Sequence, residues 1–148
     1  MKNTAWRQPS EWSQRLEAYV GKMMCEKLGA GYKWHKLPKQ YERSADLIIM
    51  KPDGSPEMLI EVKGRPSSTF QQRDEVFIGV HKLMHIRQLA DHTGLPAYIF
   101  YGYKNGEVYS LDTSIKPDRM EMMQDGRSDS KMDFDPVWYW DKNHCVKQ

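Results

Sequence analysis

The chain has 148 residues, of which 39% are hydrophobic and 28% charged, an ordinary composition for one globular domain with its own core. It contains no apolar run near the ~20 residues that a transmembrane helix needs, and its first residues lack the apolar stretch of a secretory signal. Cys25 and Cys145 are the only cysteines and form no CxxC pair, so neither a disulfide framework nor a cysteine zinc site is indicated and an intracellular location is expected.

The formal net charge of +2 hides an uneven distribution. Residues 1–104 contain 16 Lys/Arg and 11 Asp/Glu, a net of +5, whereas residues 105–148 contain 6 and 9, a net of −3. This asymmetry is typical of a basic working body followed by an acidic end. It permits nucleic-acid binding without requiring it, and taken alone it fits a solvated surface better.

The first predicted element is a helix that begins at about residue 11 and ends at Leu28, before Gly29 and Gly31. Its apolar residues recur on one stripe that is expected to pack against a sheet: Trp12, Leu16, Tyr19, Val20, Met23 and Met24. Residues 32–43 are basic with interleaved aromatics and a proline, and they are expected to form an extended connection.

A β-hairpin is predicted next. Residues 44–51 form a short apolar run rich in β-branched side chains, and residues 57–64 alternate cleanly between apolar and polar. The turn signal at residues 52–55 lies between them, which is the pattern of two paired strands. Residues 65–74 contain Pro66 and are expected to form a loop.

The second half repeats the order of helix and hairpin. Residues 76–92 predict a helix that ends at Gly94, and Asn105-Gly106 marks a hairpin turn between two further strands. After Asp112 the pattern decays, and only residues 137–140 suggest one more strand or a packing patch. We therefore predict a mixed α/β sheet in a single domain over residues 1–148, with its core at about 11–112 and a polar, acidic extension at 113–148.

Pairing across the first hairpin brings three polar side chains together. The turn is centred between Asp53 and Gly54, so without a bulge the numbers of paired residues sum to 107 and Asp46 lies opposite Glu61. Alternate residues of a strand share a face, so Lys63 points the same way as Glu61. Directly opposed Cβ atoms lie about 5 Å apart. Two carboxylates at that distance, beside apolar neighbours, repel each other unless a cation binds between them.

Mg²⁺ and Mn²⁺ fit this pair because they prefer oxygen ligands and often take one or two carboxylates together with water and phosphate. Lys63 is then placed to orient a water on the ion or to offset negative charge on an attacked phosphate. The alternative is an exposed edge hairpin on which Glu61 and Lys63 form ordinary ion pairs. The Asp at the opposing position favours the metal site.

The pattern of Asp46 followed by Glu61-Val62-Lys63 resembles the PD-(D/E)xK nuclease superfamily, particularly its small phage and Holliday-junction-resolvase-like members. The resemblance implies a restriction-endonuclease-like core, a mixed sheet flanked by helices. It also implies that Asp46, Glu61 and the backbone carbonyl of Val62 bind Mg²⁺ or Mn²⁺ and that Lys63 serves catalysis. Ala45 stands where the nominal motif has proline, a frequent departure within the superfamily.

Many members of the superfamily add a Glu from the first helix. Leu16-Glu17 matches that helical pattern, so the resemblance implies Glu17 as a further catalytic carboxylate, in preference to Glu11 and Glu26. A solvent-facing helical Glu accounts for Glu17 equally well. The resemblance covers about residues 11–112.

Basic and amide side chains supply candidate DNA contacts. In the family a Gln or Lys on the second helix often contacts the region of the scissile phosphate, which implies Lys82 and Gln88. Residues 33–43 mix positive charge with aromatics, as surfaces that follow phosphates and stack bases do, and Arg65 and Arg73 are candidates to extend that surface. The main candidates are Lys36, Lys39, Arg43, Arg65, Lys82 and Gln88. Ordinary solvated charge is the alternative for each.

The second predicted helix also carries His81, His85 and His92 in a narrow sector. A HxxxH pair can bind zinc, but this one lacks the Glu that serves as the base in HExxH. A polar or DNA-facing stripe fits these histidines better.

The sequence thus predicts an Mg²⁺- or Mn²⁺-dependent endonuclease that hydrolyses DNA phosphodiester bonds. The small size favours a phage or prophage role in recombination or repair, within the host cytoplasm, and a homodimer is compatible with the resemblance. The alternatives are a nucleic-acid-binding module that keeps the fold without catalysis, and a zinc hydrolase that uses the histidine stripe.

Overall fold

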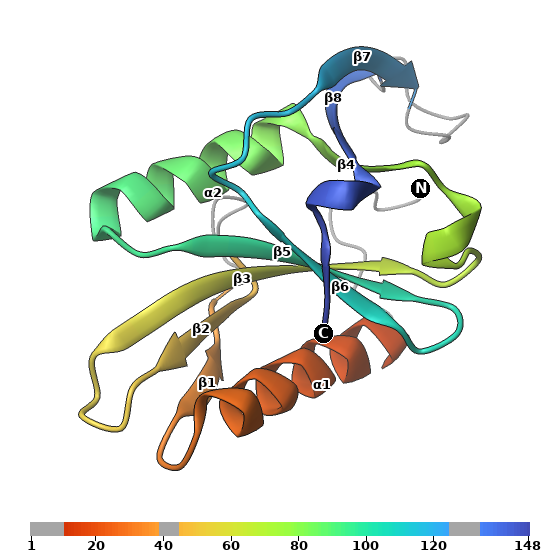
Figure 1. The fold of residues 1–148 in the computed structure, drawn as a ribbon. Helices are drawn as coiled ribbons and strands as arrows, with labels where there is room; N and C mark the ends of the chain where they lie inside the picture. The colour runs from red at the N-terminus through yellow and green to blue at the C-terminus, as the bar shows by residue number, and fades with distance from the viewer. Residues whose placement is uncertain (1–10, 39–44, 125–133) are drawn as a thin grey trace, which may run out of the picture.

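The computed structural model describes residues 11–38, 45–124 and 134–148, which form two sheets and two long helices (Figure 1). The larger sheet has the strand order β1-β2-β3-β5-β6-β9 and the smaller one β4-β8-β7. The helices are α1 (Glu11–Leu28) and α2 (Val80–Thr93), with short 3₁₀ turns at Phe70–Gln72 and Lys142–His144. The strands are β1 (Lys33–Lys36), β2 (Leu47–Met50), β3 (Pro56–Arg65), β4 (Glu75–Gly79), β5 (Ala97–Tyr103), β6 (Val108–Asp112), β7 (Arg119–Gln124), β8 (Phe134–Asp141) and β9 (Val146–Lys147).

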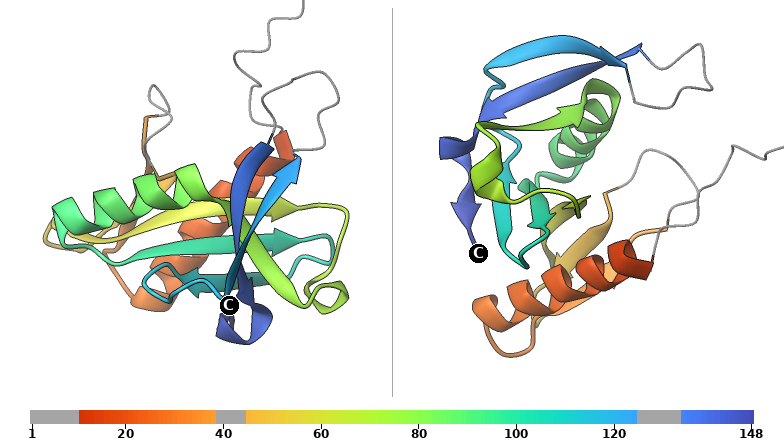
Figure 2. Two further views of the ribbon diagram at one scale, coloured as in Figure 1. Left: turned by 90° about the horizontal axis from the view of Figure 1, so that it is seen from above. Right: turned by 90° about the vertical axis from the view of Figure 1, so that its right-hand side faces the viewer.

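The larger sheet separates two hydrophobic cores. On one face α1 packs Val20 against Ile60 and Phe100, and on the other face α2 packs Leu83 against a cluster that includes the fully buried Trp140 of β8. The right-hand view of Figure 2 shows the sheet between the two helices, with the smaller sheet on the side of α2. This is the mixed α/β architecture that the sequence predicts. No helix in the described ranges is long and apolar enough to cross a bilayer.

The first helix lies close to the sheet because two paired glycines leave room for it. Gly64 of β3 is the parallel partner of Gly102 of β5. A Cβ on Gly64 would fall 2.1 Å from the Trp12 ring, and one on Gly102 would fall 2.5 Å from Leu16. Both side chains therefore rest on bare backbone, and any larger residue at either glycine would push α1 outward.

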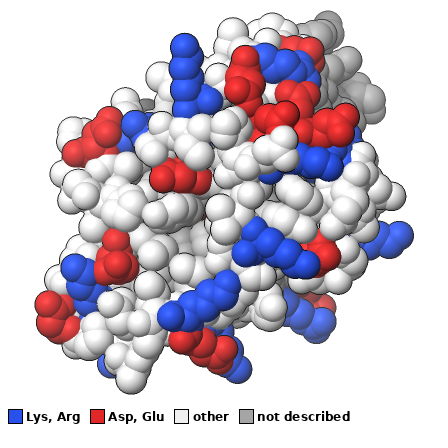
Figure 3. Space-filling model, in the orientation of Figure 1, with Lys and Arg blue, Asp and Glu red and all other residues white. Residues whose placement is uncertain are grey.

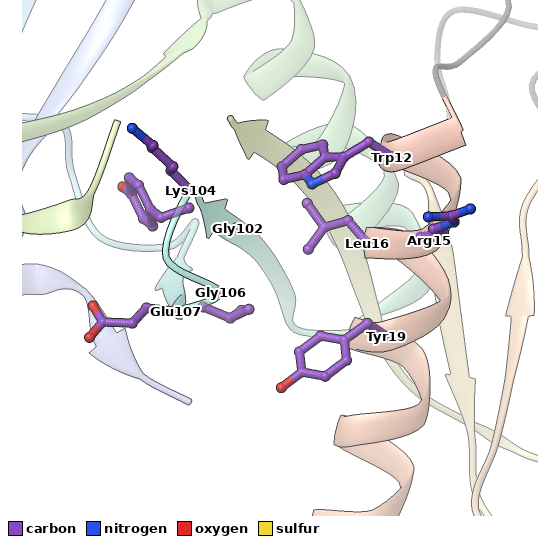
Figure 4. A pocket seen from close by; sticks show the side chains of 10 residues that line it. Trp12, Arg15, Leu16, Tyr19, Gly102, Lys104, Gly106 and Glu107 are labelled. Atoms are coloured by element: carbon purple, nitrogen blue, oxygen red, sulfur yellow. The ribbon is translucent and has the colours of Figure 1, made fainter. Parts of the chain in front are cut away.

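The predicted apolar stripe of α1 is wrong at Tyr19, whose side chain is 54% exposed. The buried side of the helix instead includes Glu17 and Val20. The reason is that Trp12, Leu16 and Tyr19 point from α1 towards the β5–β6 turn and line an open pocket of about 300 Å³ (Figure 4). That pocket keeps one flank of the helix in contact with solvent.

The first hairpin has the predicted register where it matters for the site. Leu47 lies opposite Ile60 and Ile49 opposite Met58, so their numbers sum to 107 as expected. The predicted centre of the turn is wrong by half a residue, because Met50 pairs with Pro56 and these numbers sum to 106. A β-bulge between Ile49 and Met50 returns the following pairs to the predicted sum of 107. The bulge therefore compensates for the displaced turn.

Three segments differ from their predicted structure. Residues 33–36, expected to be an extended connection, form the edge strand β1 paired with β2. Residues 75–79, mostly expected to begin the second helix, form β4, and α2 starts at Val80. The segment after residue 112 contains β7 and β9, which were not predicted, together with β8, where a strand was foreseen. Strand β4 pairs with β8, which lies more than 50 residues further along the chain, so the sequence of residues 75–79 alone does not reveal this pairing.

Candidate active site

The carboxylates of Asp46 and Glu61 lie side by side at the junction of β2 and β3. The backbone N–H of Asp46 donates to the carbonyl of Ile60 (3.0 Å), and the Asp46 Oδ2 accepts from the backbone N–H of Val62 (2.8 Å). These two bonds hold Asp46 against the residues on either side of Glu61. Asp46 is 8% exposed and Glu61 only 2%, so both carboxylates have lost most of their hydration.

Two ammonium groups flank Glu61. Lys63 Nζ lies 3.4 Å from its Oε1, and Lys82 Nζ lies 3.3 Å from its Oε2. Within the described part of the chain, Oε2 is buried and accepts no well-formed hydrogen bond, so Lys82 acts on it as an ion pair. Lys63, predicted to share a face with Glu61, does so.

Burial raises the pKa of the Glu61 carboxyl to about 7, and the negative charge of Asp46 adds to that rise. Lys63 and Lys82 act in the opposite direction, since each favours the ionised form. The repulsion expected between facing carboxylates is thus present, and the two lysines offset it only in part.

Lys82 reaches this site because of where α2 begins. The helix starts at Val80 and not near residue 76, so Lys82 lies in its first turn, over β3. A cation in a first turn is disfavoured by the helix dipole. The buried carboxylate beside it supplies the compensating charge. The sequence indicated Lys82 as a DNA contact but gave no sign of its ion pair with Glu61.

Glu17 projects from α1 on the other side of the sheet from α2. It is 4% exposed, and its Oε2 lies 3.6 Å from Nζ of Lys36. Lys36 ends β1 opposite Leu47, next in sequence to Asp46. The described ranges contain no group of three or more His, Cys, Asp or Glu side chains placed to hold a metal ion. Glu17 is therefore buried near the end of β2 without joining Asp46 and Glu61 as a third carboxylate, and its catalytic role stays a prediction.

The remaining candidates are spread more widely. Arg65 lies two residues beyond Lys63 on β3, partly buried between aromatic rings. Gln88 is exposed further along α2, and Lys39 and Arg43 fall outside the described residues. Of the three histidines of α2, His81 and His92 are exposed and His85 is half-buried, an arrangement that resembles a polar stripe more than a zinc site.

The chemistry of the donor set fits a hard divalent cation. Asp46 and Glu61 offer carboxylate oxygens, which Mg²⁺ and Mn²⁺ prefer, and the buried Glu61 Oε2 has the Lys82 ammonium group 3.3 Å away but no well-formed hydrogen bond among the described residues. A cation between the carboxylates would offset both the burial and the repulsion from Asp46 that raise the pKa of Glu61. These residues are therefore suited to hold such an ion.

Comparison with known proteins identifies a similar solved structure and a matching protein family. The chain resembles the solved structure of Archaeoglobus fulgidus Hjc, a Holliday junction resolvase from an archaeal hyperthermophile, with a TM-score of 0.56 and 12% identity over 92% of this chain and 91% of that one. At this identity the likeness shows the fold, which is restriction-endonuclease-like as predicted. No curated protein matches significantly. A sequence model described as phage putative PDDEXK endonuclease matches residues 13–144, and the chain therefore belongs to that family.

Proposed function

We propose that this protein is an Mg²⁺- or Mn²⁺-dependent deoxyribonuclease that hydrolyses DNA phosphodiester bonds during phage recombination or repair. The observation that supports the proposal most strongly is the buried pair of Asp46 and Glu61, with two lysine ammonium groups against Glu61. A purely structural site would have little reason to bury two neighbouring carboxylates at a cost to stability. Family membership supplies the nuclease assignment to which this site belongs.

Each residue of the site has a distinct role in this proposal. Asp46, Glu61 and the carbonyl of Val62 would hold the ion, and the hydrogen bond from the Val62 N–H fixes the Asp46 carboxylate in place. The ion, when bound, supplies Lewis-acid activation of water and of the phosphate. Lys63 donates hydrogen bonds to the non-bridging oxygens of the scissile phosphate and so offsets the charge that develops there.

Lys82 has a second role in the same site. Without a divalent ion its ammonium group, together with that of Lys63, partly balances the charge of Glu61. With a divalent ion bound at Glu61, the Lys82 ammonium group would be available to a DNA phosphate. Glu17 acts from the neighbouring helix as an outer carboxylate, tied to Lys36.

DNA is the partner that this arrangement implies, and the contacts are shared among basic and amide side chains. The proposed contacts are Lys36, Lys39, Arg43, Arg65, Lys82 and Gln88. On the face drawn in Figure 3, lysine and arginine side chains alternate with acidic ones and do not form one continuous basic surface. The proposal therefore depends on these particular contacts and not on a continuous basic surface on that face. We place the protein in the host cytoplasm, where a homodimer would allow two strands to be cut.

The decisive experiment incubates purified protein with plasmid, linear, single-stranded and branched DNA, each with Mg²⁺, Mn²⁺ or EDTA. We expect cleavage of at least one DNA with either ion and none in EDTA or with Glu61→Gln. Binding without cleavage in every condition would identify a non-catalytic DNA-binding module. Cleavage that requires added zinc would instead favour a site on the histidines of α2.

A further inference from the structure

A second concave site lies directly beyond the carboxylates along β3. It has a volume of about 80 Å³, where ~10–15 Å³ is enough for one water molecule, and the residues that line it include Arg65, Ser68, Arg73, Glu75, Phe77 and Tyr101. Its size suits a single tetrahedral anion better than a base or a sugar. Its lining contains two arginines and one carboxylate.

Arg65 is held rigidly in this pocket. Its guanidinium lies 4.5 Å from the centre of the Phe77 ring and 5.5 Å from that of Tyr101. One terminal nitrogen donates to the Phe77 carbonyl (3.2 Å) and the other to the Gly64 carbonyl (3.1 Å). The Tyr101 hydroxyl donates to the same Phe77 carbonyl (3.0 Å). Three of the five N–H donors of Arg65 remain without a partner among the described residues.

The charge of the pocket is not balanced from within. Glu75 is bound by Arg119, whose nitrogens lie 2.6 and 2.8 Å from its two carboxylate oxygens. Neither Arg65 nor Arg73 forms an ion pair with a carboxylate of the described residues. Burial lowers the pKa of the Arg65 guanidinium, and the neighbouring Arg73 also lowers it. An arginine remains charged under such conditions, so an anion that entered the pocket would add a charge partner to the rings and carbonyls that already contact Arg65.

The pocket is aligned with the proposed active site. Glu61, Lys63 and Arg65 alternate along one face of β3, and Tyr101 lies beside Lys63 on β5. A strand advances about 3.3 Å per residue, so the Cα atoms of Lys63 and Arg65 lie ~7 Å apart. Phosphates of one DNA strand follow one another every ~3.4 Å along the helix axis, so the pocket lies within reach of a phosphate close to the cleaved one.

We propose that Arg65 and Arg73 bind the DNA phosphate next to the one that is cleaved, with the Ser68 hydroxyl as a further donor. This inference rests on the proposed nuclease function, to which it adds a phosphate position. The ligand chemistry is a phosphate of one DNA strand, either an internal phosphodiester or the phosphate at a strand end. The smaller sheet has a part in this site, because Phe77 of β4 orients Arg65.

The test measures binding of a fluorescent DNA hairpin by anisotropy in EDTA, over a series of NaCl concentrations. The hairpin carries either a 5′-phosphate or a 5′-hydroxyl. We expect Arg65→Gln and Arg73→Gln each to weaken binding roughly tenfold and to reduce the slope of log K against log[salt] by about 1. Equal losses on both DNAs assign an internal phosphodiester, and losses confined to the 5′-phosphorylated DNA assign a terminal phosphate.

Arg15→Gln is the matched control, because Arg15 is exposed on α1, across the sheet, and should leave the slope unchanged. Arg65→Lys keeps the charge without the planar fork, so it should retain the slope but lose affinity. Arg73 is exposed, so Arg73→Gln tests the pocket even if Arg65→Gln does not fold. Unchanged slopes in both Gln variants would overturn the proposal. Binding is measured in EDTA and does not require cleavage. If the Gln variants reduce the salt slope but the wild-type protein never cuts DNA, the phosphate site is supported and only the nuclease function is contradicted.

Discussion

The two faces of β3 meet very different surroundings. Towards α1, Ile60 is fully buried against Val20 and Phe100 in an apolar cluster. Towards α2, Glu61 is almost as deeply buried but lies among charges, with Lys63 and Lys82 in contact with it. Beyond Leu59, which still belongs to the apolar cluster under α2, the odd-numbered residues Glu61, Lys63 and Arg65 are charged, whereas Met58 and Ile60 pack in the cluster under α1. The apolar face stabilises the strand enough for the other face to bury a strained carboxylate.

The largest expected effect is the loss of DNA cleavage when a residue on the α2 side of β3 is replaced. Glu61→Ala should reduce DNA cleavage by about 10³-fold or more, because the ion loses a carboxylate ligand, and Asp46→Ala and Lys63→Ala should behave alike. Initial rates on the DNA that the wild type cuts would measure this. Glu57→Ala is the control on the same strand, since Glu57 pairs with Lys51 at the turn end and should retain activity. Substantial cleavage by Glu61→Ala would remove the active site from this face.

The converse change addresses the apolar face. Ile60→Ala should lower the free energy of unfolding by about 2–5 kcal/mol, because it leaves a cavity between β3 and α1. Chemical denaturation would measure the loss. The rate of cleavage per folded molecule should fall far less than in Glu61→Ala. A destabilisation under 1 kcal/mol would mean that this face does not hold the strand as the structure suggests.

The pH dependence of stability gives a further contrast. The pKa of Glu61 rises from its ordinary 4.5 to about 7, so between these values the folded state keeps a proton that the unfolded state has released. Stability of the metal-free protein should therefore fall, by up to ~3 kcal/mol, as the pH rises through this window. Thermal unfolding in EDTA at several pH values tests this. Glu61→Gln should flatten the profile, and an equally steep profile in that variant would assign the dependence to another group.

The smallest expected effect concerns the carboxylate on the α1 side. Glu17→Gln should preserve the fold and DNA affinity but lower the cleavage rate modestly, with a milder loss in Mn²⁺ because Mn²⁺ is less exacting about its ligands. Steady-state rates in both ions, with Glu26→Gln as an exposed control on the same helix, would measure the difference. Equal rates for Glu17→Gln and wild type in Mg²⁺ would reduce Glu17 to its ion pair with Lys36.

The hairpin site could be predicted because its signals are local. A turn, two alternating strands and one register place Asp46, Glu61 and Lys63 together, and each of these features spans only a few residues. The nature of β4 could not be predicted in the same way, because an apolar run such as residues 75–79 fits either a strand or the start of a helix. Only its pairing with β8 makes it a strand.

The consequences of that one boundary extend into the site. With α2 starting at Val80, Lys82 meets Glu61, and with β4 extended, Phe77 stacks on Arg65. Glu17 illustrates a second limit of the sequence. The burial of Glu17 depends on how α1 is rotated about its axis above Gly64 and Gly102. Helical periodicity alone predicted that Tyr19 would face the sheet, whereas Tyr19 is exposed and Glu17 is buried.

The pairing of β4 with β8 also sets an order of events during synthesis. Residues 46–112 contain both carboxylates, their lysines and the strands and helix around them, but β4 has no sheet partner until residue 141 has been made. Trp140, which completes the core beside α2, arrives equally late. Contacts between segments so far apart in sequence form slowly. During synthesis, Asp46, Glu61 and their lysines would therefore be in place before β4 could pair with β8 and orient Phe77 against Arg65.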